Sequence, residues 1–267
     1  QSFADIYAQT IAYGLFAARL HDKTPDDFSR QEAVFLIPKT NPFLRGLFNY
    51  ISGAECDDRI AWIIDSLANA FLATDLEKLL EGFSKNIGLD NPIIHFYETF
   101  LTEYDSEVRK ARGVWYTPKP IVEFIVKACD HVLKTDFGII DGLADETKLE
   151  GSDVHKVQIL DPATGTGTFL AEVIKQIKEN YWGGGWSRYV ENSLIPRLNG
   201  FELLMASYAM AHLQLDLHLL ETGYVPTATE NQKRFNVFLT NTLEEHFHDF
   251  DFIFAPYLAN ESLEADR

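Results

Sequence analysis

The residues best suited to chemistry in this sequence lie near its middle. An apolar run at residues 157–160 suits a buried parallel strand, and Asp161 follows it directly. A turn with Gly165 and Gly167 comes next, and residues 169–177 then carry apolar side chains at helical spacing. A strand, a glycine turn and a helix make the first half of a Rossmann-like unit, whose ligand lies beyond the carboxyl end of the strand. The pattern therefore predicts a ligand site at this turn.

The residue types at the turn favour a ligand with a cationic group over a dinucleotide. Leu170 stands where the dinucleotide fingerprint has its third glycine, and no Gly-Lys-Ser/Thr follows as it would in a Walker loop. The Asp161 carboxylate instead suits an ammonium group, and the two glycines let the backbone approach a ligand closely. An ordinary tight turn with a capping aspartate is the alternative interpretation.

A second strand is expected to end beside this turn. Residues 198–203 predict a short strand that carries Glu202 at its end. Adenosine sites commonly place an acidic residue there, where it accepts both ribose hydroxyls. The separation of Asp161 and Glu202 exceeds the roughly 20 positions of the dinucleotide fingerprint, which fits a longer first helix and a glycine break. A plain exposed carboxylate is the alternative.

A third apolar run, residues 235–240, leads into Asn241, Thr242 and Leu243. The Asn241 amide both donates and accepts hydrogen bonds, so it suits an adenine edge. Capping of the following turn by Thr240 or Asn241 is the alternative. No metal site is predicted, because the next acidic and histidine residues lack an evident helix or strand to present them; they are Glu244, Glu245, His246 and His248.

Composition and charge limit the class of protein. Apolar residues make up 46% of the chain and charged residues 24%, as is typical of a soluble globular protein. No apolar run approaches membrane-spanning length, so we expect a cytoplasmic protein without a membrane partner. Cys56 and Cys129 lie far apart and indicate neither a metal site nor a disulfide framework. A net charge of −17 argues against strong DNA binding by this chain alone, although a DNA enzyme can carry its basic surface elsewhere.

Two regions of different character must position the site residues. Residues 1–112 read as helical, with residues 56–83 as one long helix, and predict an α-helical scaffold or coupling domain. Residues 113–267 predict the N-terminal part of an α/β, Rossmann-like domain with an incomplete sheet of three or four strands. Residues 137–151 are acidic and irregular, and are expected to form a surface connection.

A short aromatic and proline-containing segment separates the two regions. Pro118 and Pro120 restrict the residues before them to extended conformations, so the helical pattern is broken here. Tyr116, Thr117 and Pro118 suit either the wall of a small-ligand pocket or a simple loop with a threonine cap.

Three stretches together resemble the S-adenosylmethionine-binding part of adenine-N6 DNA methyltransferases of the gamma arrangement. They are GVWYTP at residues 113–118, DPATGTGTFL at residues 161–170 and NGFE at residues 199–202. The similarity is greatest to the methyltransferase part of large, single-polypeptide, type I-like restriction–modification enzymes, and it implies an S-adenosylmethionine-dependent fold.

The resemblance also implies a role for each candidate residue. It places Tyr116, Thr117 and Pro118 at the methionine end of the cofactor, and Asp161 with Ala163, Thr164, Gly165, Thr166, Gly167, Thr168 and Phe169 around its amino-acid and adenosyl portions; Glu202 would bind the ribose, and Asn241, Thr242 and Leu243 would approach the adenine. In many relatives an aspartate stands where this chain has Asn241.

The residues that the family uses for catalysis are not expected in this chain. Such enzymes flip the target base out of the duplex and grip its amine with an Asn (or Asp)-Pro-Pro-Tyr motif, which is absent from the 267 residues. The nearest segment, Phe254-Ala255-Pro256-Tyr257, is either a degenerate motif or, as we favour, part of the acidic connector that precedes the motif. Both interpretations predict cofactor binding without turnover and no catalytic residue.

The same resemblance implies partners outside this chain. DNA would be bound through other parts of the protein, and nuclease or helicase domains could belong to the same polypeptide. Two other functions stay open: a methyltransferase of RNA or protein, and a non-catalytic acidic interaction module with a vestigial nucleotide fold. The second would show an occluded site, with Trp115, Tyr116 or Phe169 filling the space above Gly165.

Overall fold

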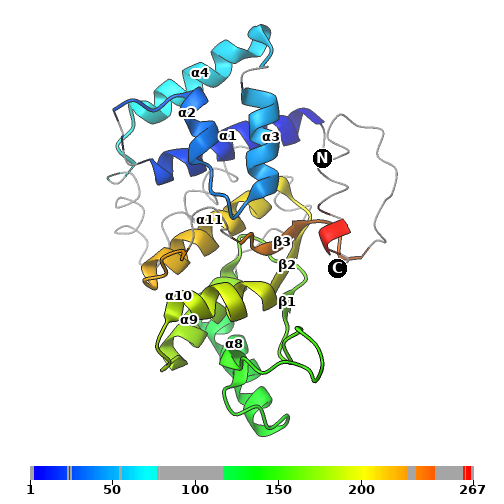
Figure 1. Cartoon of the computed structure of the whole chain (residues 1–267). Helices are drawn as coiled ribbons and strands as arrows, with labels where there is room; N and C mark the ends of the chain where they lie inside the picture. Colours follow the sequence, from blue (N-terminus) through cyan, green and yellow to red (C-terminus); the bar gives the residue numbers. More distant parts are fainter. Residues whose placement is uncertain are drawn as a thin grey trace. The chain divides into compact units, whose positions relative to one another are not determined.

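The computed structural model describes residues 3–22, 24, 26–53, 56–76, 78, 117–227, 233–243, 261 and 263–265 (Figure 1). The chain divides into two compact units. Of the described residues, those up to 78 belong to the first unit and those from 117 onward to the second. In the part of the chain that the structure describes, no helix combines the length and apolar character needed to cross a membrane.

The described part of the first unit contains four named helices: α1 (Phe3–His21), α2 (Arg30–Leu36), α3 (Pro42–Ser52) and α4 (Asp58–Leu72). Helix α1 packs against each of the other three. Side-chain caps start these three, since Ser29 Oγ accepts from the Glu32 amide, Asn41 Oδ1 from the Leu44 amide and Asp57 Oδ1 from the Arg59 amide. Helix α1 buries Ile11, Leu15 and Ala18.

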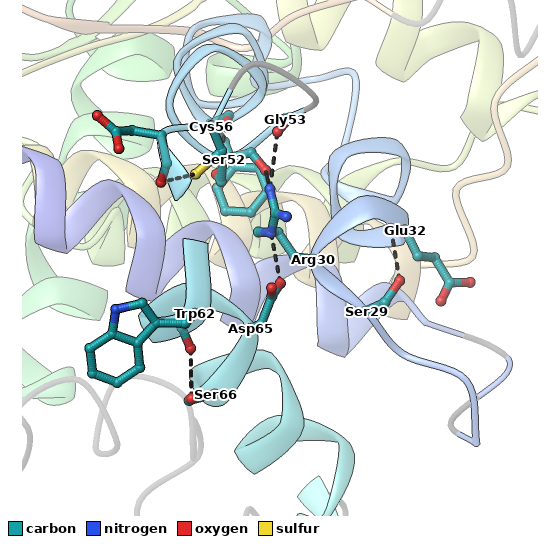
Figure 2. Close-up of polar contacts among 11 residues, drawn as sticks. Ser29, Arg30, Glu32, Ser52, Gly53, Cys56, Trp62, Asp65 and Ser66 are labelled. Carbon is teal, nitrogen blue, oxygen red and sulfur yellow. Dashed lines mark hydrogen bonds and ion pairs between the residues drawn. The ribbon is translucent and has the colours of Figure 1, made fainter. Parts of the chain in front are cut away.

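An arginine ties three of these helices together, as Figure 2 shows. Arg30, at the start of α2, donates from Nη1 to the carbonyl oxygens of Ser52 at 2.8 Å and Gly53 at 3.0 Å, where α3 ends. Its Nε donates to Asp65 Oδ1 of α4 at 2.7 Å. The planar guanidinium can serve carbonyl and carboxylate acceptors at once, so it satisfies the end of α3 while it binds α4.

The prediction of one helix over residues 56–83 is wrong. Helix α4 ends at Leu72, and residues 73–75 form a turn before the chain is helical again at residues 76 and 78. Asp75 explains the break, because its Oδ1 accepts from the Lys78 amide at 3.1 Å and so caps a new helical start. Residues 79–83 lie outside the described residues.

The second unit is built on a parallel sheet of three strands in the order β1–β2–β3. They are β1 (Ile159–Asp161), β2 (Leu198–Glu202) and β3 (Asn236–Leu239). Asp161 pairs with Gly200 in the register, and Glu202 pairs with Leu239. The predicted α/β class with a small parallel sheet is confirmed.

The longer helices of this unit are α8 (Lys119–Thr135), α9 (Thr168–Asn180) and α11 (Met205–Glu221). Shorter pieces are α10 (Trp186–Tyr189), η2 (Val190–Leu194), η3 (Ile195–Arg197) and η1 (Gly142–Ala144). Helix α9 packs against α8 and α11, and α11 packs against β2 and β3. The predicted apolar face of α9 is buried, with Leu170, Val173, Ile174 and Ile177. Right-handed crossovers that step in one direction along the sheet place α9 and α11 on the same face.

The connection after α8 is more than a surface loop, contrary to our expectation. Gly142, Leu143 and Asp145 are buried. Asp130, itself buried in α8, accepts from the Leu143 amide at 2.9 Å and pairs with Lys134 Nζ at 2.6 Å. This carboxylate fixes η1 against α8.

Candidate functional site

The carboxyl ends of the three parallel strands bring the predicted site residues to one edge of the sheet. Asp161 ends β1, Glu202 ends β2, and Asn241 follows β3 after Thr240. This edge is where open α/β sheets bind their ligands.

The turn after β1 depends on two glycines for different reasons. Gly165 has φ +56° and Gly167 has φ +86°, a backbone region that favours glycine. A Cβ on Gly167 would lie 3.2 Å from Ala211 Cα, so this glycine lets the turn pack closely on α11. From a Cβ on Gly165, the one described atom within reach is the Ala163 carbonyl oxygen at 4.0 Å. Among the described residues, therefore, none fills the space at Gly165, and this includes Phe169.

Hydrogen bonds fasten this turn to the neighbouring strand. The Thr164 amide donates to the Phe201 carbonyl at 2.9 Å, and Thr164 Oγ1 donates to the Asp161 carbonyl at 3.0 Å. The hydroxyl needs the space beside Gly200, where a Cβ would approach Thr164 Oγ1 to 2.5 Å. Our sequence reasoning gave Gly200 no site role of its own, although a glycine inside a strand is a known mark of close backbone approach.

The Asp161 carboxylate is only half satisfied. Its Oδ1 accepts from the Ala163 amide at 3.2 Å, whereas its buried Oδ2 has no hydrogen-bond partner among the described residues. Burial raises the pKa of Asp161 above its ordinary value, and the Ala163 bond opposes this shift. Such an oxygen is ready to accept from a ligand donor or to pair with a ligand cation.

The Glu202 side chain is buried and each of its carboxylate oxygens accepts a backbone amide, so the alternative of a plain exposed carboxylate is wrong. Its side chain accepts from the Gly165 amide at 2.8 Å through Oε2, and from the Leu204 amide at 2.7 Å through Oε1. Burial raises the pKa of Glu202, and the negative charge of Asp161 raises it further, while the bonds from Leu204 and Gly165 lower it.

The residues after β3 also reach the turn. Thr242 Oγ1 donates to the Pro162 carbonyl at 2.5 Å and so joins this loop to the one after β1. Asn241 Oδ1 accepts from the Leu243 amide at 3.1 Å, which is the capping role considered as an alternative. The Leu243 side chain is 93% exposed.

The remaining candidates occupy the start of two helices. Thr166 and Thr168 lie with their hydroxyl oxygens 3.4 Å apart at the N terminus of α9, followed by the half-buried Phe169. Helix α9 begins after Gly167 with no side-chain cap, which leaves its first amides to other acceptors. Thr117 and Pro118 stand just before α8. Several predicted features lie outside the described residues: Trp115, Tyr116, the acidic and histidine residues 244–248, and Ala255-Pro256-Tyr257.

Comparison with solved structures shows a shared fold. The DrdV–DNA complex is 23% identical with a TM-score of 0.50, covering 90% of this chain and 20% of that one. A nuclease-deletion mutant of the Type ISP restriction–modification enzyme LlaGI with a DNA substrate mimic is 21% identical, with a TM-score of 0.56 and coverages of 98% and 18%. The ATP-dependent Type ISP enzyme LlaBIII bound to DNA is 20% identical, with a TM-score of 0.53 and coverages of 98% and 16%.

This chain thus spans a fifth or less of the length of those matched chains. No curated protein matches it. The family model described as N-6 DNA Methylase matches residues 91–261, which is well over half of the chain and includes all three strand tips. The chain belongs to the N-6 DNA methylase family.

Proposed function

We propose that this chain is the S-adenosylmethionine-binding part of an adenine-N6 DNA methyltransferase of a restriction–modification system. The observation that carries the proposal is the buried Asp161 Oδ2 at the tip of β1, which has no hydrogen-bond partner among the described residues and lies beside a glycine turn that the same residues leave open at Gly165. The cofactor fits this arrangement, because it has an ammonium group for a carboxylate and a nucleoside for a close backbone approach.

Each site residue receives a role in this proposal. The Asp161 carboxylate would accept from the cofactor ammonium, and the turn from Ala163 to Phe169 would line its amino-acid and adenosyl portions. Glu202 would accept from the ribose hydroxyls through lone pairs that its two backbone bonds leave unused. Asn241, Thr242 and Leu243 would lie at the adenine, with Tyr116, Thr117 and Pro118 at the methionine end.

The cofactor supplies a methyl group on a sulfonium, whose positive charge drives its departure to the adenine amine. The chain's own residues would bind and orient this group. The motif that grips the flipped base is absent from the 267 residues, so we propose that this chain by itself binds the cofactor without turnover.

DNA would be held by other parts of a larger polypeptide. The charge of −17 supports this division, because phosphate binding requires a basic surface. The titles of the similar structures name DNA complexes, a deleted nuclease and ATP dependence for those proteins. In the same proposal, residues 1–112 form the helical scaffold or coupling domain, and residues 113–267 form the N-terminal part of the methyltransferase domain.

Isothermal titration calorimetry with S-adenosylmethionine tests this function. We expect one site on the wild-type chain and an affinity at least about tenfold lower for Asp161→Asn, equal to a loss of about 1.4 kcal/mol. Asp130→Asn is the matched control, since Asp130 is a buried carboxylate that also accepts a backbone amide but belongs to the α8–η1 junction. An absence of heat at millimolar cofactor would contradict the proposal.

A further inference from the structure

Glu202 is the residue at which the ends of all three strands meet. Its backbone carbonyl accepts from the Thr240 amide, just after β3, at 2.8 Å. Its Oε2 accepts from Gly165 in the turn after β1, and its Oε1 accepts from Leu204 in the loop after β2. The side chain belongs to a residue only 9% exposed, so these bonds are shielded from water.

The bond to Gly165 acts on one of the two glycines of the turn. Gly165 has φ +56°, and a glycine loses more backbone freedom on ordering than any other residue. The neighbouring anchors hold the turn at Thr164 and Gly167, through bonds to the Phe201 and Thr164 carbonyls. Between these anchors, the charge-assisted bond from the Gly165 amide to Glu202 fixes a peptide beside which the described residues leave open space.

We propose that Glu202 is a positioning residue that clamps the glycine turn and the loop after β2 into their binding shape, in addition to any contact with a ligand. One lone pair on each carboxylate oxygen holds a backbone amide, and the other lone pair stays available to a ligand hydroxyl. The clamp is a property of the protein alone, whereas its effect on S-adenosylmethionine rests on the proposed function. By holding both loops before a ligand binds, the Glu202 carboxylate would lower the conformational entropy lost on binding.

Variants of graded acceptor capacity separate the clamp from simple packing. Glu202→Leu keeps much of the side-chain bulk but removes both acceptors, so the Gly165 and Leu204 amides both lose their partner. Glu202→Gln keeps one acceptor oxygen and turns a donor toward the other amide, so one of the two bonds survives. The clamp therefore predicts the order Glu, Gln, Leu in the number of protected amides, which a packing role would not produce.

Amide hydrogen exchange followed by NMR on the whole cofactor-free chain measures this order. We expect the Gly165 and Leu204 amides to be protected in the wild type and to exchange at least about tenfold faster in Glu202→Leu. One of the two should stay slow in Glu202→Gln. The Thr164 amide, which donates to Phe201, is the internal control, and Asp130→Asn is the control variant. Wild-type exchange rates at both amides in Glu202→Leu would overturn the inference.

A second measurement needs no variant and covers the case in which the substitutions prevent folding. If both amides bond to one carboxylate, the Gly165 and Leu204 amide protons of the wild type should shift with a common midpoint as pH is varied. Different midpoints, or no shift at either amide, would overturn the clamp.

Cofactor titration of the same variants separates this inference from the proposed function. Loss of amide protection with a tenfold or greater loss of S-adenosylmethionine affinity supports both. Loss of protection in a chain whose wild type binds no cofactor supports the clamp and refutes the proposed function. Unchanged protection with normal wild-type cofactor binding refutes the clamp and leaves the proposed function standing.

Discussion

The two carboxylates at the strand tips differ in how completely they are satisfied. Both oxygens of Glu202 accept backbone amides, whereas Asp161 Oδ2 is buried without a partner among the described residues. A buried acceptor without a hydrogen-bond donor lowers the stability of the fold, and such a loss is typical of sites that bind a ligand. The cost at Asp161 can be measured as a pH-dependent stability.

We predict that Asp161→Asn stabilises the fold at pH 8. The pKa of Asp161 is raised by burial, so the folded state keeps the proton at pH values where the unfolded chain has released it. The contribution of Asp161 to stability is therefore fully present below its pKa in the unfolded chain, roughly 4. This contribution is lost as pH rises through the raised pKa of the folded state. The amide carries no charge and should gain about 1 kcal/mol at pH 8, with no gain at pH 3.5, in urea unfolding.

Asp57→Asn provides a control of opposite sign. Hydrogen bonds from Arg59 lower the pKa of Asp57 to about 2. The contribution of Asp57 to stability is therefore present above its pKa in the unfolded chain, and it is lost as pH falls through the lowered pKa of the folded state. That variant should lose stability at pH 8 relative to pH 3.5. Equal or lower stability of Asp161→Asn at pH 8 would contradict the reading of Asp161 as an unsatisfied acceptor.

At the scale of the elements, the turn after β1 keeps its place because β2 carries a glycine opposite it. We predict that Gly200→Ala destabilises the second unit by about 1–3 kcal/mol, because its Cβ would lie 2.5 Å from Thr164 Oγ1. Thr164→Ala removes that atom, so the double variant should be less destabilised than the sum of the two single variants. Urea unfolding of the four proteins gives the coupling energy.

Gly184→Ala is the control for this series, since no atom of the described residues lies within 4 Å of its Cβ position. It should change stability by less than about 0.5 kcal/mol. Strictly additive effects of Gly200→Ala and Thr164→Ala would show that the two residues do not compete for the same space.

The elements could be predicted where one local signal dominates. The strand patterns before Asp161, Glu202 and Asn241 predicted the three strands. The first of them, β1, is less buried than expected, because Leu160 is 54% exposed. The break after Leu72 was missed, since the apolar spacing continues across it and the Asp75 cap is a single polar residue. The engagement of Glu202 was also missed, because it depends on the distant Gly165 amide, which no local pattern encodes. The site roles of the turn residues stay predictions.

At the scale of the whole molecule, we propose that this chain binds the cofactor and that other parts of a larger polypeptide bind DNA. It spans a fifth or less of the matched chains, and its charge of −17 opposes phosphate binding. What it does provide is an edge of a parallel sheet with the buried Glu202, the half-buried Asp161 and a glycine turn that the described residues leave open at Gly165. Cofactor binding is therefore the function that this chain can be asked to show by itself.

A crystal structure of the chain grown with saturating S-adenosylmethionine tests this claim most directly. We expect density for the cofactor over Gly165, with its ammonium group against Asp161 Oδ2 and its ribose hydroxyls against Glu202. A turn without cofactor under those conditions, or carboxylates of Asp161 and Glu202 directed away from a common ligand, would contradict the account.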